Sequence, residues 1–416
     1  MGKIRYVLFI VWCLLAAPFR LLASADSVHV SLMTCAPGPA VYEQYGHTAI
    51  RYEDSSRNLD IVFNYGMFSF NTPNFVRRFV KGETDYQLGI APYPYFEMEY
   101  AERGSSVYQQ ELNLTEAEKQ RLFQLLEENY LPQNRTYRYN FFYDNCTTRA
   151  RDMVERAVEG TVVYPETGQE GATGVNRHLS FRQLVHLHTS STLWNQFGID
   201  LLLGADADDS ISRRQQQFAP LLLMHDLRGA MIQRGDTLVP LVKKETKVVD
   251  MDPVQFPEPD FNTEEVDSLL PAGSWNGFTP WTASLLFLII YIGIGVYSIR
   301  SRRVLWWADL VLYLVQGVAG CVVGMLYFFS THPTVGSNWL VFVFNPLPLL
   351  YLPRMIDLAV KGQKDPFHRI YGLYLTIFIG ILLACPQYFG IIIVPLYACL
   401  WWNSWVHVIV YLKRNE

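Results

Sequence analysis

The 416-residue chain is poor in charge and in cysteine. Charged residues make up 18% of it, the formal net charge is −5, and there are six cysteines. It contains no glycine-rich phosphate-binding loop, no nucleic-acid-binding patch and no internal repeat, which excludes the usual signatures of nucleotide-dependent enzymes, nucleic-acid-binding proteins and repeat proteins. Apolar residues, in contrast, account for 50% of the length. Their uneven distribution indicates a membrane protein with a soluble part.

The first 25 residues have the pattern of a secretory signal. Two basic residues precede an apolar run at positions 7–19, and small residues at positions 23–25 form a cleavage pattern. Arg20 interrupts the approach to that pattern, so an uncleaved signal anchor is the alternative. Either form places the following domain outside the cytoplasm.

Beyond residue 276 the chain carries five apolar segments long enough to cross a membrane as helices. These segments are residues 281–299, 304–329, 338–353, 370–387 and 389–412. Lys and Arg gather after the first and third segments and at the C-terminus, whereas the loops at 331–338 and 386–390 have neither. Because positive loops stay in the cytoplasm, we expect the soluble domain in the periplasm of a bacterial inner membrane and the C-terminus in the cytoplasm.

Residues 26–249 are predicted to form one α+β domain. A linker rich in Pro, Asp and Glu at 250–275 joins it to an all-α transmembrane bundle at 276–416. Apolar periodicity predicts strands near 28–34, 48–52, 59–70 and 237–242, and helices at 115–130, 148–158, 181–188, 191–203 and 213–233. Thr115 and Glu118 form a capping box at the start of the first of these helices.

Two short motifs carry residues suited to thiol chemistry. Cys146 lies where an aromatic, strand-like run gives way to a helical one, so its thiol is expected in the first turn of a helix. Free N–H groups and the helix dipole favour a thiolate there. His47 follows Gly46 and begins an alternating strand, which makes it the candidate base. A lone histidine at a strand start is more often structural, so the hypothesis depends on its pairing with Cys146.

A disulfide is the competing interpretation of the cysteines. They occupy positions 13, 35, 146, 321, 385 and 399. Only Cys35 and Cys146 belong to the exported domain, and two such cysteines commonly pair in an oxidising compartment. Such a bond would make the domain a structural module, or would be a reversible inactive state of an enzyme.

The order of the two motifs, with His47 about 100 residues before Cys146, resembles the circularly permuted papain-like (NlpC/P60-like) superfamily. That superfamily includes lecithin-retinol acyltransferase-like enzymes. The resemblance implies that a polar residue on the neighbouring strand orients the imidazole. Asn64 is the best-placed candidate and Asp60 the second, although polar strand residues often simply face solvent.

Longer motifs resemble one particular family more specifically. They are Leu32-Met33-Thr34-Cys35-Ala36-Pro37-Gly38, Tyr45-Gly46-His47-Thr48-Ala49-Ile50-Arg51, Phe63-Asn64-Tyr65-Gly66, Leu112-Asn113-Leu114-Thr115 and Asp144-Asn145-Cys146-Thr147-Thr148-Arg149. With the predicted domain order, they resemble the Lnb-type lipoprotein N-acyltransferases of Bacteroides-like bacteria. The resemblance implies a cofactor-free transfer of a fatty acyl chain from a membrane phospholipid to a diacylated lipoprotein. The acceptor is the α-amino group of the S-diacylglyceryl cysteine, and the intermediate is a thioester on Cys146.

Further residues near the motifs are candidates for substrate binding. Arg149 and Arg151 could bind the donor phosphate, because guanidinium groups suit bidentate phosphate contact. Ion pairing on their own helix is the alternative. Tyr45 and Tyr143 are also candidates. An apolar pocket is expected to shield the thioester from water. Its candidate lining residues, for which plain core packing is the alternative, are Phe68, Phe70, Tyr93, Tyr95 and Phe96.

No metal site is predicted. His178, His186 and His188 lack companion ligands at a metal-binding spacing, and the acidic stretch at 204–209 lacks the calcium-loop pattern. In the membrane half, His332 and the Asn345-Pro346 pair have two interpretations. They could help to admit a lipid substrate, or they could be ordinary loop and kink residues.

Two other functions fit parts of the pattern. A membrane-anchored thiol hydrolase, such as a phospholipase or a cell-wall peptidase, would use the same thiol site with water as acceptor. A disulfide-linked envelope module would have no chemistry at all. Five membrane spans favour the acyltransferase, because an enzyme with two lipid substrates gains effective concentration from a membrane anchor.

Overall fold

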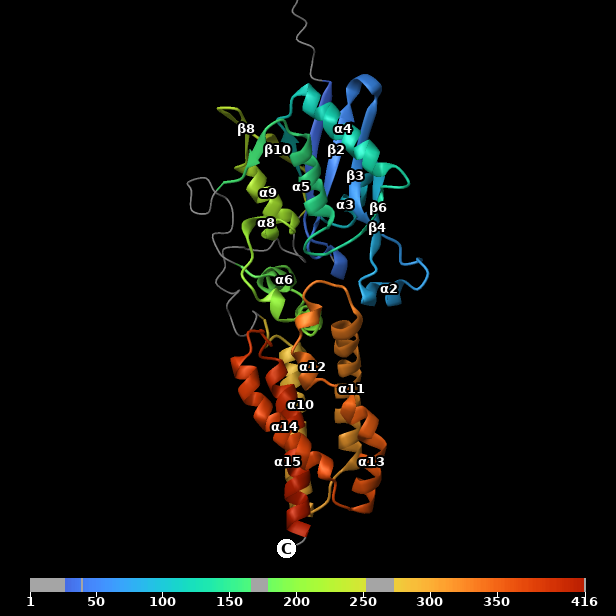
Figure 1. The fold of residues 1–416 in the computed structure, drawn as a ribbon, viewed down its shortest axis with the longest axis vertical. Helices are drawn as coiled ribbons and strands as arrows, with labels where there is room; N and C mark the ends of the chain where they lie inside the picture. Colours follow the sequence, from blue (N-terminus) through green and yellow to red (C-terminus); the bar gives the residue numbers. More distant parts are fainter. Residues whose placement is uncertain (1–26, 39, 166–178, 252–272, 415–416) are drawn as a thin grey trace, which may run out of the picture.

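The computed structural model describes residues 27–38, 40–165, 179–251 and 273–414. They form an elongated molecule with a mixed α/β domain at one end and a helical bundle at the other (Figure 1). The predicted α+β domain followed by five apolar helices is thereby confirmed. The expected signal, most of the expected linker and His178 lie outside the described residues.

A seven-stranded antiparallel sheet is the centre of the α/β domain, with the strand order β10-β5-β1-β2-β3-β4-β6. Its strands are β1 (Val28–Cys35), β2 (His47–Asp54), β3 (Leu59–Met67), β4 (Asp85–Pro92), β5 (Val107–Leu112), β6 (Thr136–Arg138) and β10 (Val242–Val249). Successive side chains of a strand point to opposite faces. Leu32, Ile50 and Phe63 therefore enter one core, and Met33 and Ala49 enter another.

Helices cover both faces of this sheet. α4 (Glu116–Tyr130) and α5 (Cys146–Ala157) pack on the larger core, and α3 (Tyr93–Glu102) packs on the smaller one. Thr115 caps α4 with the predicted capping box, since its hydroxyl accepts from the N–H of Glu118. The other elements of the domain are η1 (Val41–Glu43), η2 (Ser55–Arg57), α2 (Phe75–Lys81), β7 (Thr161–Val163), α6 (Phe181–Thr189), α7 (Leu193–Asp200), η3 (Ala205–Ala207), α8 (Arg213–Gln216), α9 (Pro220–Arg228), β8 (Met231–Arg234) and β9 (Thr237–Pro240).

The single helix predicted for residues 213–233 is wrong. The chain forms α8, then α9, and then the strand β8, which joins β7 and β9 in a small second sheet. Pro220 has no N–H to continue a helix and instead takes the first turn of α9, and Gly229 ends that helix. The apolar periodicity of the segment is real, but these two residues divide it.

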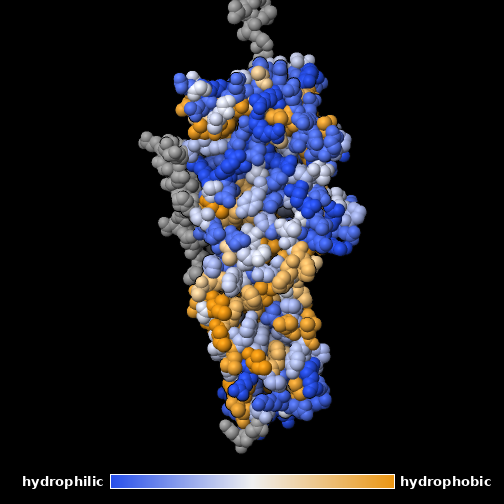
Figure 2. Space-filling view, viewed as in Figure 1, coloured by the Kyte–Doolittle hydropathy of each residue, from blue (hydrophilic) through white to orange (hydrophobic). Residues whose placement is uncertain are grey.

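Among the described residues of the second half, five helical spans are long and apolar enough to cross a membrane. They are α10 (Pro280–Ser301), α11 (Trp306–Phe329), α12 (Leu340–Val343) with α13 (Leu347–Lys361), α14 (Pro366–Ala384) and α15 (Ile393–Arg414), and η5 (Val335–Ser337) lies in a loop. The third span is interrupted at Asn345-Pro346. Figure 2 shows hydrophobic residues over much of the visible face of the bundle, whereas the α/β domain is mostly hydrophilic.

The α/β domain contacts the two bundle loops that contain no Lys or Arg. The N–H of Thr331 donates to the carbonyl oxygen of Lys81 at 3.0 Å. In the other loop, the N–H of Tyr388 donates to the carboxylate of Asp208 at 3.1 Å. The basic connections meet at the far end of the bundle, where the side chain of Arg414 donates to backbone carbonyls of the two basic loops. The structure and the charge pattern thus assign the same loops to the same end of the bundle.

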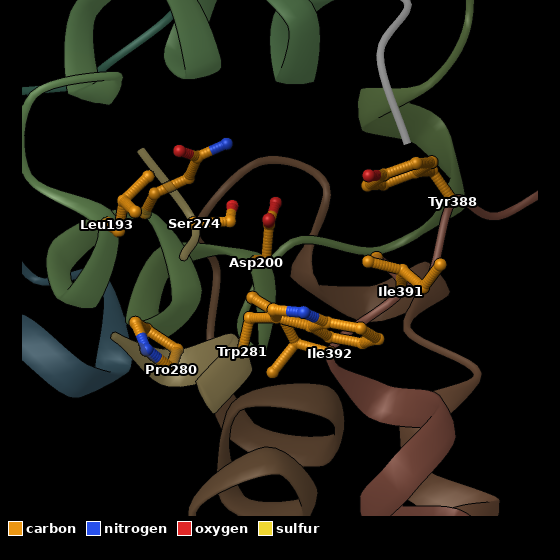
Figure 3. A pocket seen from close by; sticks show the side chains of 10 residues that line it. Leu193, Asp200, Ser274, Pro280, Trp281, Tyr388, Ile391 and Ile392 are labelled. Carbon is orange, nitrogen blue, oxygen red and sulfur yellow. The ribbon is translucent and has the colours of Figure 1, made fainter. Parts of the chain in front are cut away.

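A cavity of about 20 Å³ lies in the contact between domain and bundle (Figure 3). Gln196 and Asp200 of α7 and Trp281 of α10 are among its lining residues. The buried Oε1 of Gln196 and Nε1 of Trp281 have no hydrogen-bond partner among the described residues. A cavity of this size has room for about one water molecule, which could bond to these two atoms.

Candidate active site

Cys146 is the first residue of α5, where the sequence places it. Asn145 caps the helix, because its Oδ1 accepts from the N–H groups of Thr147 and Thr148, each at 2.9 Å. The amide of Asn145 also donates to the carbonyl oxygen of Phe218 at 2.9 Å. The start of the helix is therefore held on two sides. Cys146 itself is 8% exposed.

His47 is the first residue of β2, and its position depends on Gly46. Gly46 has a φ of 77°, and a Cβ at this residue would lie 2.4 Å from the carbonyl oxygen of Cys35. Only glycine fits there. The β2–β3 register sets Ala49 opposite Asn64. Side chains two residues apart share a face, so Asn64 is a diagonal neighbour of His47, and its Oδ1 lies 3.2 Å from His47 Nε2.

Asp60, the second candidate for orienting the imidazole, is paired elsewhere. Its two carboxylate oxygens accept from Nε and Nη2 of Arg51 at 2.9 and 2.8 Å. The same guanidinium lies over the ring of Tyr93. Strand register therefore gives Asn64, and not Asp60, the contact with the imidazole.

His47 and Cys146 lie close enough together for each to shift the pKa of the other. Nε2 of His47 meets Asn64, which leaves Nδ1 for the sulfur. Burial raises the pKa of the Cys146 thiol, but the adjacent imidazole, the Thr48 N–H and the Thr147 hydroxyl outweigh it and lower the pKa to about 7. Burial lowers the pKa of His47, whereas the charge of Cys146 and the hydrogen bonds raise it above its ordinary value. Both net shifts favour a thiolate–imidazolium pair.

Tyr139 is a site residue that the sequence analysis did not single out. Its ring lies beside Cys146, and burial together with the charge of Cys146 holds the pKa of its hydroxyl well above the usual value, so the hydroxyl keeps its proton. Gly66 makes room for both residues. It has a φ of 83°, and a Cβ there would lie 3.2 Å from the Tyr139 ring and 3.7 Å from Cys146 Cβ. In the sequence, Tyr139 differs from other residues only by belonging to the aromatic run before Cys146. Aromatic residues are common in protein cores, so this run does not identify Tyr139 as a site residue.

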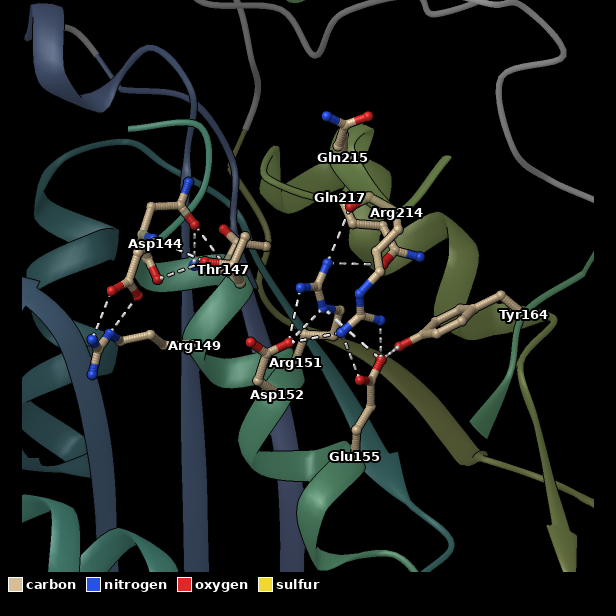
Figure 4. Close-up of polar contacts among 12 residues, drawn as sticks. Asp144, Thr147, Arg149, Arg151, Asp152, Glu155, Tyr164, Arg214, Gln215 and Gln217 are labelled. Carbon is tan, nitrogen blue, oxygen red and sulfur yellow. Dashed lines mark hydrogen bonds and ion pairs between the residues drawn. The ribbon is translucent and has the colours of Figure 1, made fainter. Parts of the chain in front are cut away.

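The guanidinium groups of Arg149 and Arg151 are held by neighbouring side chains (Figure 4). Arg149 donates to both carboxylate oxygens of Asp144, at 2.6 and 2.7 Å. Arg151 is 7% exposed and donates to Asp152 at 2.8 Å and to Gln217 at 3.2 Å. Ion pairing, the alternative interpretation, accounts for these contacts. Phosphate binding by either arginine stays a prediction and would compete with them.

Tyr45 and Tyr143 differ in exposure. Tyr45 is buried and stacks on His188 of α6, with the ring centroids 5.2 Å apart. Tyr143 is 51% exposed and packs edge-on against Phe181. Tyr143 thus presents surface to a ligand, whereas Tyr45 supports the motif of His47 from within. A contact of either residue with substrate stays a prediction.

A continuous series of aromatic rings runs from the thiol to the bundle. Its members, which we call the aromatic row, are Phe68, Phe70, Phe75, Phe79, Tyr86 and Tyr139. Tyr139 packs on Tyr86 with centroids 4.7 Å apart, and Tyr86 stacks on Phe68 at 4.8 Å. The rings continue without a gap to Phe79, which packs against His332 in a bundle loop at 5.3 Å.

The five residues expected to line an apolar pocket separate into three groups. Phe68 and Phe70 belong to the aromatic row, and Phe70 is 62% exposed. Tyr93 and Phe96 are buried in the core beneath α3, so core packing accounts for them. Tyr95 is exposed.

Cys35 and Cys146 are both free thiols in this structure. Cys35 lies in the core beneath α3, whereas Cys146 lies in the core of α4 and α5. Burial raises the pKa of the Cys35 thiol far above its usual value. The chemical asymmetry between the two cysteines favours Cys146 as the nucleophile.

Two family models match the chain. One, described as the Lnb N-terminal periplasmic domain, matches residues 19–170, and the other, described as the Lnb transmembrane domain, matches residues 272–415. The chain belongs to the Lnb family. No curated protein and no solved structure matches it.

Lnb membership agrees with the architecture and includes the site. The residues matched by the periplasmic model contain His47, Asn64 and Cys146, and those matched by the transmembrane model contain all five spans. This Lnb protein is therefore a multi-pass membrane protein with a periplasmic domain. Its family is consistent with lipoprotein N-acylation.

Proposed function

We propose that this Lnb protein transfers a fatty acyl chain from a membrane phospholipid to the α-amino group of the S-diacylglyceryl cysteine of a lipoprotein. The observation that carries the proposal is the placement of Cys146, His47 and Asn64 together in a domain that contacts membrane helices. Both substrates are anchored in the membrane, with reacting atoms near the headgroup plane. A thiol domain tethered at that plane reaches both at high effective concentration.

The first half-reaction makes a thioester. His47 takes the proton of Cys146, and the thiolate Sγ attacks the carbonyl carbon of a phospholipid ester. The ester C–O bond then breaks, and the His47 imidazolium gives its proton to the leaving glycerol oxygen. A lysophospholipid departs. Asn64 keeps the ring oriented throughout by accepting from Nε2.

The second half-reaction makes an amide. The free amine of the lipoprotein attacks the thioester carbon, His47 accepts a proton from the amine nitrogen, and the C–S bond breaks. Proton return from His47 restores the thiol of Cys146. Water competes with the amine at this stage, so the site gains from apolar surroundings.

Two donors are suited to the oxyanion of both tetrahedral intermediates. The N–H of Cys146 has no carbonyl partner within its own helix, because it belongs to the first residue of α5. The next two N–H groups, of Thr147 and Thr148, already donate to Asn145 and are not free. The Tyr139 hydroxyl, which lies near Cys146 and keeps its proton, is the second donor.

The aromatic row offers the donor lipid a path from the membrane to the thiol. Its outer members are exposed at the level of the bundle loops, with Phe70 62% and Phe79 47% exposed. Its inner member, Tyr139, lies beside Cys146, with Gly66 making room for both. Apolar rings of this kind bind acyl chains without specific hydrogen bonds, which suits a substrate that varies in chain length.

Charge supports an orientation with the C-terminus in the cytoplasm. The basic connections meet at the end of the bundle opposite the α/β domain. Such loops are retained in the cytoplasm, which supports a periplasmic position for the α/β domain and its thiol.

Mass spectrometry of lipoprotein N-terminal peptides tests the reaction. Cells that depend on this protein would express the wild type, Cys146→Ala or His47→Ala. We expect a third acyl chain on the peptide with the wild type and only two with either variant. Cys35→Ala is the matched control, since it removes the other exported thiol, and it should keep triacylation.

Unchanged triacylation in Cys146→Ala would overturn the mechanism. Release of lysophospholipid by the wild type without any N-acylated peptide would instead assign water as the acceptor and make the protein a phospholipase.

A further inference from the structure

Three side chains that can bind a metal meet among the membrane helices. Asp309 lies near the start of α11, His368 near the start of α14, and His407 toward the end of α15. One ligand atom from each residue lies within 4.8 Å of the other two. The two imidazole rings are stacked, with centroids 3.5 Å apart. None of these residues takes part in the proposed acyl transfer.

The cluster contains buried polar atoms without partners. Oδ2 of Asp309 and Nε2 of His368 accept or donate no hydrogen bond among the described residues. Their side chains are 1% and 0% exposed. Oδ2 of Asp365 is also without a hydrogen bond and lies 3.9 Å from Nε2 of His368. A buried polar atom without a hydrogen bond destabilises the fold, and one cation bonded to all of these atoms would remove that cost.

We propose that Asp309, His368 and His407 bind a divalent transition-metal ion, with Asp365 available as a fourth ligand. Zinc is the best chemical fit, because it accepts imidazole nitrogen and carboxylate oxygen together. Charge balance points the same way. Two carboxylates and one dication sum to zero, and net charge among membrane helices is costly. Neither aspartate forms an ion pair with Lys or Arg among the described residues.

Neighbouring side chains hold the ligands in place. The hydroxyl of Tyr313 lies 3.4 Å from Nδ1 of His368, which leaves Nε2 for the metal. The amide of Asn403 donates to Oδ1 of Asp309 at 2.9 Å, which leaves Oδ2. Such contacts fix the direction of metal ligands in known sites. Zinc–ligand bonds are about 2.0–2.2 Å long, so small rotations must draw the donor atoms together, and the bond from His407 Nε2 to Asp309 Oδ1 must open.

A cavity beside the cluster gives an ion access. It has a volume of about 320 Å³ and is lined by His407 and Asp365, among others. A water molecule from this side can complete the coordination. Because the ion would join α11, α14 and α15, its main effect would be on the stability of the bundle.

Metal analysis of the full-length protein tests the proposal. The protein would be purified in detergent without chelators and without a polyhistidine tag, and its metals measured by plasma mass spectrometry. We expect about one zinc ion per chain in the wild type and in Cys146→Ala, and loss of zinc in Asp309→Asn and His368→Ala. His186→Ala is the matched control, because His186 pairs with Asp200 in the α/β domain at 2.8 Å, and it should keep its zinc. Asn403→Ala should weaken zinc binding about 10- to 100-fold.

A second measurement does not depend on the folding of variants. Wild-type protein stripped with a chelator would be titrated with Zn²⁺, with Co²⁺ and with Mg²⁺. We expect Zn²⁺ to raise the melting temperature, Co²⁺ to give visible d–d absorption, and Mg²⁺ to do neither. Purified wild type without zinc, together with no response to Zn²⁺ or Co²⁺, would overturn the proposal and leave only the hydrogen bond between His407 and Asp309. Retention of zinc in Cys146→Ala keeps this result separate from the acyl-transfer proposal.

Discussion

Nε2 of His47 lies 3.2 Å from Oδ1 of Asn64, across the pair of strands β2 and β3. An imidazole that donates to an amide oxygen through one nitrogen presents the other nitrogen to the sulfur. The direction of the ring is thus fixed before substrate binds. This contact makes His47 a base of defined geometry, and it can be tested by removing either partner.

Asn64→Ala should weaken the thiolate–imidazolium pair without abolishing it. The lost hydrogen bond is worth about 1 kcal/mol, which corresponds to an about fivefold slower alkylation of Cys146 below its pKa. Asp60→Asn is the control. Because Asp60 bonds to Arg51 and not to His47, this substitution should leave the alkylation rate unchanged. Equal effects of both variants would show that the strand, and not the contact with His47, is responsible.

The reactivity of Cys146 should follow a pKa of about 7. Since this pKa is depressed, the thiolate is present above pH 7 and is lost as the pH falls through that value. The rate of iodoacetamide labelling, with the site assigned by peptide mass spectrometry, should rise and level off accordingly. In His47→Ala the charge that lowers the pKa is gone and burial remains, so the rise should move above pH 9. Cys35, whose pKa burial raises, should not label below that pH.

Tyr139→Phe should lower acyl transfer while Cys146 stays reactive. Loss of one oxyanion donor typically reduces kcat about 100- to 1,000-fold. Tyr137→Phe is a matched control, since the buried Tyr137 hydroxyl has no hydrogen-bond partner among the described residues. Turnover with vesicle phospholipid and a diacylated peptide, measured beside iodoacetamide labelling, separates the two steps. A Tyr139 variant with full turnover would remove this residue from the mechanism.

Phe70→Ser should impair the use of lipid donors held in vesicles. Burial of a phenylalanine side chain contributes about 1.5–3 kcal/mol, so kcat/KM for the donor should fall about 10- to 100-fold. Labelling of Cys146 by water-soluble iodoacetamide should not change. Tyr95→Ser tests a residue of similar exposure, 65% against 62% for Phe70, outside the aromatic row. If both variants behave alike, the row has no special role.

Arg151→Gln should destabilise the α/β domain. The Arg151 guanidinium is nearly inaccessible and bonds to Asp152, to Gln217 and to the carbonyl of Arg214. Loss of hydrogen bonds to a buried charged group costs about 1.5–3 kcal/mol, which thermal unfolding would detect. The exposed Arg121 on α4 supplies the control, since Arg121→Gln should have almost no effect. A raised KM for the donor with unchanged stability would instead favour phosphate binding by Arg151.

The structural elements that depend on a short stretch of sequence could be predicted. Five apolar runs, the capping box of Thr115 and the helix start at Cys146 each depend on residues within a few positions of one another. The single helix predicted at 213–233 is wrong because Pro220 and Gly229 divide a segment whose apolar periodicity continues through both.

By itself, the sequence determined the domain order, the sidedness pattern of the loops, and the positions of His47 at a strand start and Cys146 at a helix start. Hydrophobic periodicity, turn residues and charge act over short stretches of sequence, so they can be recognised in one amino-acid sequence. Only the tertiary structure gave Asn64, and not Asp60, the contact with the imidazole, and only it placed Tyr139 beside Cys146. It also paired Arg149 with Asp144 and gathered Asp309 with His368 and His407. Each of these contacts depends on strand register, on helix rotation or on the packing of one element against another, none of which the local sequence pattern specifies.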